Sequence, residues 1–400
     1  MHFIRRTVAA VGLAVLAVAA SLSASLTVVG AEDAAGHVYV NDNTAGTNTV
    51  AAFDRHGDGT LTPLTGSPFA AGGAGTGGII GSQGALQVTS DGRYLLAVDA
   101  GSNQISVLRI HRDGRLRPVE GSPFSSGGIE PVSIAVHNSL VYVANAGNKT
   151  TGGNYTGFTL DEDGELSPLS GSTWPLPITA NPGDILFNST GTSLIGIEVG
   201  TTDPSTFLID SFVVGRNGRL TTAAGSPFHA QAAGPFGSEF SPTNPAHLYV
   251  SNAHAGAANG SVSAFNVSRA GSLSSIGASP VVNGQTGTCW LEISPDGKYL
   301  FTVNTGSSTV SSYQIQPDGS AAYLSSTAFK SGKGIAALDA RLDPAGRNLY
   351  VVDAHLNAVS AFAVSGGTLT ELPSSPFALP AGAIAFGIVV TGSQQENNER

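Results

Sequence analysis

The stretch CWLEISPDGKYLFTVN, residues 289–304, reads as a strand, a tight turn and a second strand. Apolar and polar residues alternate in its first part, which is typical of a strand with one buried face. The tetrapeptide SPDG at 294–297 has the residue types of a tight turn, and the segment 299–304 is apolar and rich in β-prone residues. The same unit returns about every 50 residues to the end of the chain, so the fold is predicted to be built from repeats.

Three short signatures recur in constant order, seven times each. The first is an apolar strand that ends in a polar residue: HVYVN at 37–41, LLAVD at 95–99, VYVAN at 141–145, LIGIE at 194–198, LYVSN at 248–252, LFTVN at 300–304 and LYVVD at 349–353. The second is a strand that leads into a turn centred on glycine, often Asp-Gly or Asn-Gly, the dipeptides that two-residue hairpin turns require. The third is GSPF or a variant of it, at 66–69, 121–124, 171–174, 225–228, 278–281, 326–329 and 374–377. Together they predict four short antiparallel strands per repeat, which we name A to D from first to last.

Four-stranded units of this length are typical of a β-propeller, in which each sheet packs its faces against two neighbours. The sequence therefore predicts an all-β, seven-bladed propeller over residues 36–392. The first repeat starts directly with strand B at His37, and the segment 383–390 provides a spare strand A after the seventh repeat. We expect this last strand to complete blade 1 and to close the ring without free sheet edges. The polar residues 393–400 are expected to form a disordered tail.

The N-terminus differs from the rest of the chain. Arg5 and Arg6 precede a long apolar run that ends in the small residues Gly30 and Ala31. This pattern predicts a secretory signal peptide over residues 1–31 and therefore an extracellular or periplasmic protein, with an uncleaved membrane anchor as the alternative.

The charge and the cysteine content limit the kinds of partner and of covalent bond that the protein can have. Removal of residues 1–31 leaves 16 Lys and Arg against 28 Asp and Glu, a net charge of −12. Nucleic acids and anionic lipids need clustered basic residues, so neither is expected as a partner, and no membrane association is expected after cleavage. Cys289 is the only cysteine, so no disulfide can form within the chain. We expect a monomer.

The combination of SPDGKYLFTVN-type units, Asp-Gly-x-Leu turns and GSPF resembles the secreted members of the β-propeller lactonase family. That family includes 6-phosphogluconolactonases and carboxymuconate lactonising enzymes, and it is related to the YVTN-repeat surface propellers. The resemblance covers about residues 36–392. It implies the propeller fold and a ligand in the funnel at the ring's centre, on the face formed by the D–A and B–C connections.

Strand A of each blade lines the channel of a propeller, so its polar residues are the first candidates for a site. Aligned on the tight turn, four of them occupy equivalent positions: Gln87, Glu239, Glu292 and Arg341. We predict that Glu239, Glu292 and Arg341 act on a substrate and that Gln87 and Asp184 help to bind it. Carboxylates and an arginine at a channel suit a polar ligand, activation of water, or polarisation of a lactone carbonyl; a solvated pore with Arg341 paired to a carboxylate is the alternative.

Other candidates lie near the loop face. His254 and His355, each two residues beyond the end of a strand B, are predicted to serve in acid–base catalysis. Three more residues are predicted to contact the ligand: Glu198, Trp290 and His229. Glu198 breaks the Asn/Asp pattern at the ends of the B strands, and the alternative for all these strand ends is capping of the next turn. Packing between blades is the alternative for Trp290.

The chain departs from the resembled family where catalysis is concerned. Active members often open an inner strand with Pro-His, but the corresponding openings here are Pro131-Val132, Pro182-Gly183 and Pro235-Phe236. No catalytic residue carries over, and the few basic residues fit a phosphorylated substrate poorly. No metal or cofactor motif is present. We therefore predict an exported lactonase-like propeller that hydrolyses or binds an unphosphorylated lactone or sugar-like molecule; the alternative is a non-catalytic propeller that binds a protein or polysaccharide through its loop face.

Overall fold

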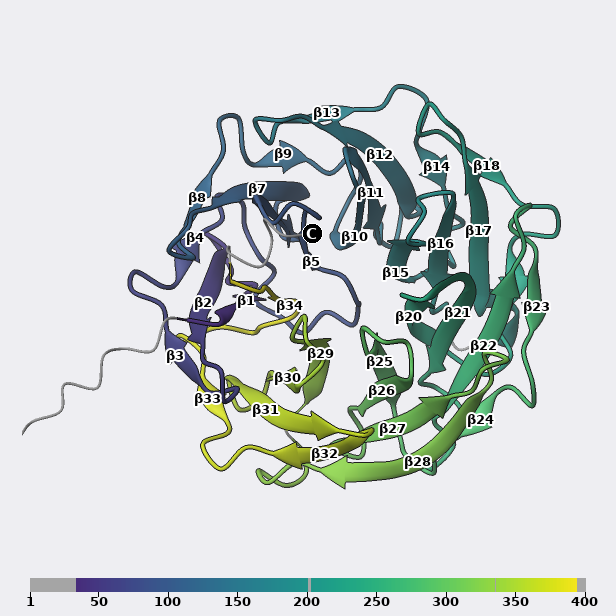
Figure 1. The fold of residues 1–400 in the computed structure, drawn as a ribbon. Coiled ribbons are helices and arrows are strands. Elements are labelled where there is room, and N and C mark those ends of the chain that lie inside the picture. Colours follow the sequence, from purple (N-terminus) through teal and green to yellow (C-terminus); the bar gives the residue numbers. More distant parts are fainter. Residues whose placement is uncertain (1–33, 201–202, 335, 394–400) are drawn as a thin grey trace, which may run out of the picture. The chain divides into compact units, whose positions relative to one another are not determined.

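Seven antiparallel sheets form a closed ring in the computed structural model, which describes residues 34–200, 203–334 and 336–393. Each sheet is one blade, with its strands in the order A, B, C, D from the centre outward (Figure 1). The predicted leader and the predicted tail beyond residue 393 lie outside the described residues. Within the described residues, no helix is long and apolar enough to cross a membrane.

The strands follow the predicted repeats. In blades 1 to 7, strand A is β34 (Ile388–Val390), β5 (Leu86–Val88), β10 (Pro131–His137), β15 (Pro182–Phe187), β20 (Pro235–Ser241), β25 (Thr288–Ile293) and β29 (Ala337–Leu342). Strand B is β1 (Gly36–Asn41), β6 (Tyr94–Asp99), β11 (Leu140–Asn145), β16 (Ser193–Glu198), β21 (Asn244–Asn252), β26 (Tyr299–Asn304) and β30 (Asn348–Asp353). Strand C is β2 (Thr49–Arg55), β7 (Gln104–Ile110), β12 (Asn154–Leu160), β17 (Leu208–Val214), β22 (Ser261–Val267), β27 (Thr309–Ile315) and β31 (Ala358–Ser365). A short 3₁₀ helix, η1 (Pro204–Thr206), lies in the B–C connection of blade 4.

Strand D is divided into two short pieces in all blades except blade 6. The pieces are β3 (Leu61–Pro63) and β4 (Phe69–Ala70), β8 (Leu116–Pro118) and β9 (Phe124–Ser125), β13 (Leu166–Pro168) and β14 (Trp174–Pro175), β18 (Leu220–Thr222) and β19 (Phe228–His229), β23 (Leu273–Ser275) and β24 (Val281–Val282), and β32 (Thr368–Glu371) and β33 (Phe377–Ala378). Both pieces pair with the same strand C. In blade 6 they are replaced by the continuous β28 (Ala321–Ala328), where the signature reads STAF.

The serine of GSPF explains how a divided strand D is tolerated. At the gap, an amide of strand C has lost its backbone partner, and a buried amide without an acceptor is costly. In blade 2 the Ser122 hydroxyl accepts this bond from the Val107 amide at 3.0 Å, and in blade 5 Ser279 accepts from Ala264 at 2.7 Å. The signature is therefore a structural one.

The tyrosines of strand B link neighbouring blades. The hydroxyl of Tyr142 donates to the carbonyl of Gly218 in the C–D turn of blade 4, and Tyr249 donates in the same way to Gly319 in blade 6. Tyr350 of blade 7 donates to Gly59 of blade 1 at 2.9 Å, so the same contact spans the closure of the ring. These recurrent bonds, with the buried apolar faces of strands B and C, account for the repeated Tyr-Val motif.

The ring closes as predicted. The C-terminal β34 pairs with β1, with Val390 opposite Val38 and Ile388 opposite Val40. The residues just before β34 continue this contact, because the Phe386 amide donates to the carbonyl of Asn41 at 3.0 Å. The first and last repeats are thus joined in one sheet, and blade 1 is complete.

Candidate functional site

Three of the predicted strand-A residues meet at the channel. Glu239, Glu292 and Arg341 have the same register in their blades, since each lies opposite the aromatic residue of its strand B: Tyr249, Phe301 and Tyr350. Nη1 of Arg341 donates to Oε1 of Glu239 at 2.9 Å and to Oε2 of Glu292 at 2.7 Å. Glu292 is further held by the amide of Leu342 at 3.1 Å.

These three side chains are mostly shielded from solvent. Side-chain exposure is 16% for Arg341, 13% for Glu292 and 26% for Glu239. Burial raises the pKa of Glu239 above its ordinary value, against the charge of Arg341, which acts to lower it. Burial also acts to lower the pKa of Arg341, but the carboxylates, Glu292 first among them, raise it well above its ordinary value.

A cavity of about 250 Å³ lies beside this group and is lined by two further predicted residues, Gln87 and Asp184. Its walls include residues 134–136 of β10 and 185–187 of β15. These segments form the second halves of their strands, so the cavity occupies the part of the channel toward the A–B turns. Oδ2 of Asp184 accepts from the amide and the hydroxyl of Ser238, at 2.9 and 2.7 Å.

A segment whose path the sequence did not predict lies across the other end of the channel. Between β4 and β5 the chain crosses the centre of the ring (Figure 1). The amide group of Gln83 donates to the carbonyl of Ser238 at 3.0 Å and accepts from the amide of Leu291 at 3.0 Å, which joins it to blades 5 and 6. Ser82 donates to the carbonyl of Val132 in blade 3 at 2.8 Å. This segment lies at the base of the funnel expected on the loop face, and Gln83, which also lines the cavity, is a residue that the sequence did not reveal. The available signal was the unusual length of this connection.

The remaining predicted residues lie elsewhere. The indole of Trp290 is 2% exposed, donates to the carbonyl of Ser82 at 2.7 Å and packs edge-on against Phe236. Glu198 is buried beside Asp210, and burial raises the pKa of both carboxyl groups. The three histidines, His229, His254 and His355, are exposed, and in the described part of the chain none of them forms an ion pair with a carboxylate.

The polar residues at the ends of the B strands are buried within the blades. Asn304 donates to the hydroxyl of Ser311 at 2.8 Å, and the carboxylate of Asp99 accepts from Asn48 at 2.8 Å and from Ser106. Asp353 accepts from Ser360 in the same arrangement. The serine contacts join strand B to strand C within a blade, and the Asn48 contact joins blade 1 to blade 2.

Buried carboxyl groups make the stability of the fold depend on pH. Burial raises the pKa of Asp42, Asp184 and Asp353 to about 7 and that of Asp339 to about 6. An unfolded Asp titrates at about pH 4, so between about pH 4 and 7 the folded state holds protons that the unfolded state has released. The free energy of unfolding therefore falls as the pH rises through this window. We expect the melting temperature, followed by circular dichroism, to be higher at pH 5 than at pH 8 by about 5 °C or more.

Asp353→Asn provides the matched control for this pH dependence, because four other blades carry Asn at this position: Asn41, Asn145, Asn252 and Asn304. The variant removes one titrating group and is expected to be more stable than the unmodified protein at pH 8. The difference in melting temperature between pH 5 and pH 8 should therefore become smaller. If the difference in melting temperature were unchanged, titration of Asp353 would not contribute to the pH dependence of stability.

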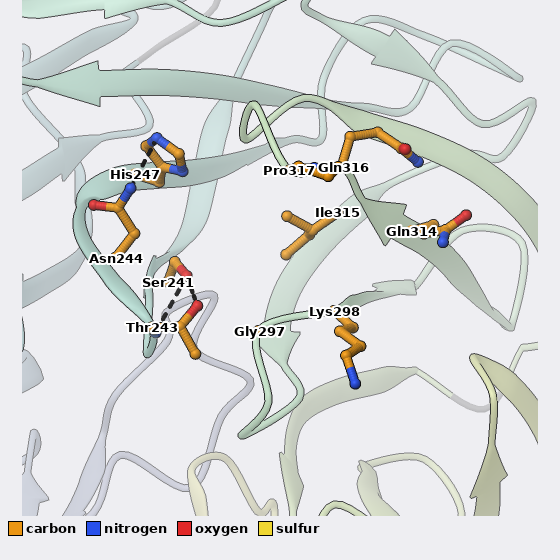
Figure 2. A pocket seen from close by; sticks show the side chains of 10 residues that line it. All are labelled: Ser241, Thr243, Asn244, His247, Gly297, Lys298, Gln314, Ile315, Gln316 and Pro317. Atoms are coloured by element: carbon orange, nitrogen blue, oxygen red, sulfur yellow. Dashed lines mark hydrogen bonds between the residues drawn. The ribbon is translucent and has the colours of Figure 1, made fainter.

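A second cavity, of about 370 Å³, lies between the A–B turns of blades 5 and 6 (Figure 2). Two pairs of its polar side chains bond to each other: Asn244 to His247 at 3.1 Å, and Ser241 to Thr243 at 3.2 Å. It contains none of the predicted site residues. Among the described residues, no group of three His, Cys, Asp or Glu side chains is placed to hold a metal ion.

Comparisons with known proteins agree with this architecture. The sequence model of the family described as "Lactonase, 7-bladed beta-propeller" matches residues 33–177 and 231–383. A proposed 6-phosphogluconolactonase of Bacteroides uniformis is 19% identical, with a TM-score of 0.71 over 90% of this chain and 100% of that chain. A periplasmic gluconolactonase of Pseudomonas aeruginosa is 16% identical, with a TM-score of 0.69 over 89% of this chain and 98% of that chain. None of the curated proteins matches this chain significantly in sequence.

At sequence identities below 20%, the structural similarity shows a shared fold. The match to the family model covers all or most of each blade except blade 4. The chain therefore belongs to the lactonase family of seven-bladed β-propellers.

Proposed function

We propose that this protein is an exported lactonase that hydrolyses an unphosphorylated lactone in the cavity beside Arg341. The observation that carries the proposal is the group of Arg341, Glu239 and Glu292 at the edge of a cavity lined by Gln87 and Asp184. Family membership and the similarity to a periplasmic gluconolactonase support the substrate class and the location.

The arrangement has the groups that lactone hydrolysis requires. Arg341 uses Nη1 for both carboxylates, and within the described residues its Nε and Nη2 make no hydrogen bond. These nitrogens are available to the carbonyl oxygen of a lactone, where negative charge develops as water attacks. Oε2 of Glu239 likewise has no partner among the described residues.

Glu239 then moves the proton. Its Oε2 removes a proton from the attacking water as the new carbon–oxygen bond forms at the carbonyl carbon. When the bond from that carbon to the ring oxygen breaks, the same carboxyl group returns the proton to the ring oxygen. The product is a hydroxy acid, and Glu239 regains its starting state.

The size and charge of the cavity predict its preference among lactones. Its volume of about 250 Å³ suits one small ring, and its nearest charged groups are carboxylates and one arginine that they already neutralise. A phosphate group would be repelled by these carboxylates. We expect kcat/KM for glucono-δ-lactone to exceed that for its 6-phosphate by at least about tenfold, measured by titration of released acid.

The double variant His254→Asn/His355→Asn tests whether hydrolysis takes place in this cavity or on the loop face. Both imidazoles are exposed and outside the cavity, so the variant should hydrolyse the lactone at the rate of the unmodified protein. Absence of hydrolysis across a panel of five- and six-membered lactones would reject the proposal. It would favour a binding role for the loop face, where Ile79, Ile178 and Val282 are each more than half exposed.

A further inference from the structure

A groove of about 660 Å³ lies at the outer edge of the ring, between the D strands of blades 1 and 2. Blade 1 contributes Thr65 and Phe69, and blade 2 contributes the segment 111–117 from its C–D turn and β8. The strands β4 and β8, which flank it, lie far from the channel (Figure 1). The groove is therefore separate from the cavity beside Arg341.

The groove is basic in a protein that is acidic overall. The segment RIHRDGRLR at 109–117 has four arginines and one aspartate, whereas the whole chain has a net charge of −10. Arg109 is turned toward Tyr94, to whose hydroxyl it donates, and Arg115 pairs with Asp113 at 2.7 Å. Within the described residues, Arg112 and Arg117 have no ion pair or side-chain hydrogen bond.

The fold does not require these arginines. Aligned on the Asp-Gly turn, blade 3 has Glu162, Glu165 and Ser167 where blade 2 has Arg112, Arg115 and Arg117. Arg117 lies directly opposite Arg109 in the β7–β8 pair, while Ser167 lies opposite Thr159 in blade 3. Like charges directly opposite each other destabilise a sheet. Repulsion between these arginines thus destabilises the free protein, and a bound anion would reduce that repulsion.

We propose that this groove binds a small acidic sugar, in which a carboxylate accompanies several hydroxyl groups. The guanidinium groups of Arg112 and Arg117 suit a carboxylate, which they can bind through paired hydrogen bonds. The half-buried ring of Phe69 offers an apolar face for a sugar ring, and the exposed hydroxyl of Thr65 lies at the same groove. The ligand is small because the attraction comes from two arginines alone, and a long polyanion would extend past them along a protein whose net charge is negative.

The test measures binding of D-galacturonate by calorimetry at low ionic strength, with D-galactose and inorganic phosphate as comparison ligands. We expect galacturonate to bind and galactose to show no binding, and we expect the affinity to weaken as salt is added. The variant Arg112→Glu/Arg117→Ser introduces the residues of blade 3 and should weaken binding by at least about tenfold. Arg216→Glu repeats the Arg112→Glu substitution at the equivalent position in the C–D turn of blade 4, and this variant should bind galacturonate like the unmodified protein.

Three results would overturn the proposal. They are no binding of galacturonate, binding that the double variant leaves unchanged, and binding of phosphate that is as tight as that of galacturonate. A melting curve establishes that the double variant is folded, and the single variant Arg117→Ser replaces it if it is not. Because the lactone assay uses a different site, its failure would leave this result unaffected.

Discussion

Replacement of Arg341 by methionine is expected to destabilise the propeller by about 3–5 kcal/mol at pH 8, and by much less at pH 5. At pH 8 the variant leaves the carboxylates of Glu239 and Glu292 close together and without the cation that both contact. Asp339 adds to this cost, because it is 1% exposed and, in the described residues, its Oδ2 has no hydrogen-bond partner. At pH 5, protons can neutralise carboxyl groups whose pKa is already raised by burial, Glu239 and Asp339 among them.

Denaturation by urea at the two pH values measures this difference, and a triple variant identifies its cause. Arg341→Met combined with Glu239→Gln and Glu292→Gln removes the cation together with its two anions. Because the cost of a broken buried pair comes mainly from the charge left behind, the triple variant should recover most of the lost stability at pH 8. An equal loss at both pH values, with no recovery in the triple variant, would mean that Arg341 acts through packing alone.

The fold could be predicted from the sequence because its signals are repeated and local. Each tight turn, such as that at 294–297, is held by short-range bonds: the Ser294 hydroxyl accepts from the amide of Tyr299, and the Asp296 carboxylate accepts from the amide of Lys298. The three repeat signatures occur seven times each and support one another, and the ring closure followed from their order. The division of strand D was not predicted, since it depends on a serine hydroxyl that replaces a backbone acceptor across two strands.

The site could be predicted only where the repeat itself fixes the register. Glu239, Glu292 and Arg341 meet because equivalent positions in neighbouring blades face one channel. The path of Gln83 depends on how a long connection packs against blades 3 to 6, and nothing in its own residues determines that. For Trp290 the alternative to a ligand was packing between blades, and for Glu198 it was capping of the next turn. Both side chains are buried, which a single sequence does not show.

The second large effect is expected for Glu239→Gln, which should lower kcat for lactone hydrolysis by about 10²- to 10⁴-fold, the usual contribution of a general base. A glutamine keeps the carbonyl oxygen that accepts from Arg341 at 2.9 Å, but it cannot take a proton from water. Because the substitution also removes a buried charge, the melting temperature at pH 8 should stay the same or rise.

The pH profile distinguishes loss of the base from damage to the cavity. Glu239 acts in its ionised form, so the rate of the unmodified protein should rise as the pH passes through a pKa that burial has raised above that of an ordinary glutamate. In Glu239→Gln that rise should disappear once spontaneous hydrolysis has been subtracted, while KM changes little. Glu120→Gln, the same substitution at an exposed position of blade 2, is the matched control and should keep both the rate and the profile. If Glu239→Gln retained the full rate, proton transfer would have to come from another group at the cavity, and Asp184, whose pKa burial raises to about 7, would be the next carboxylate to test.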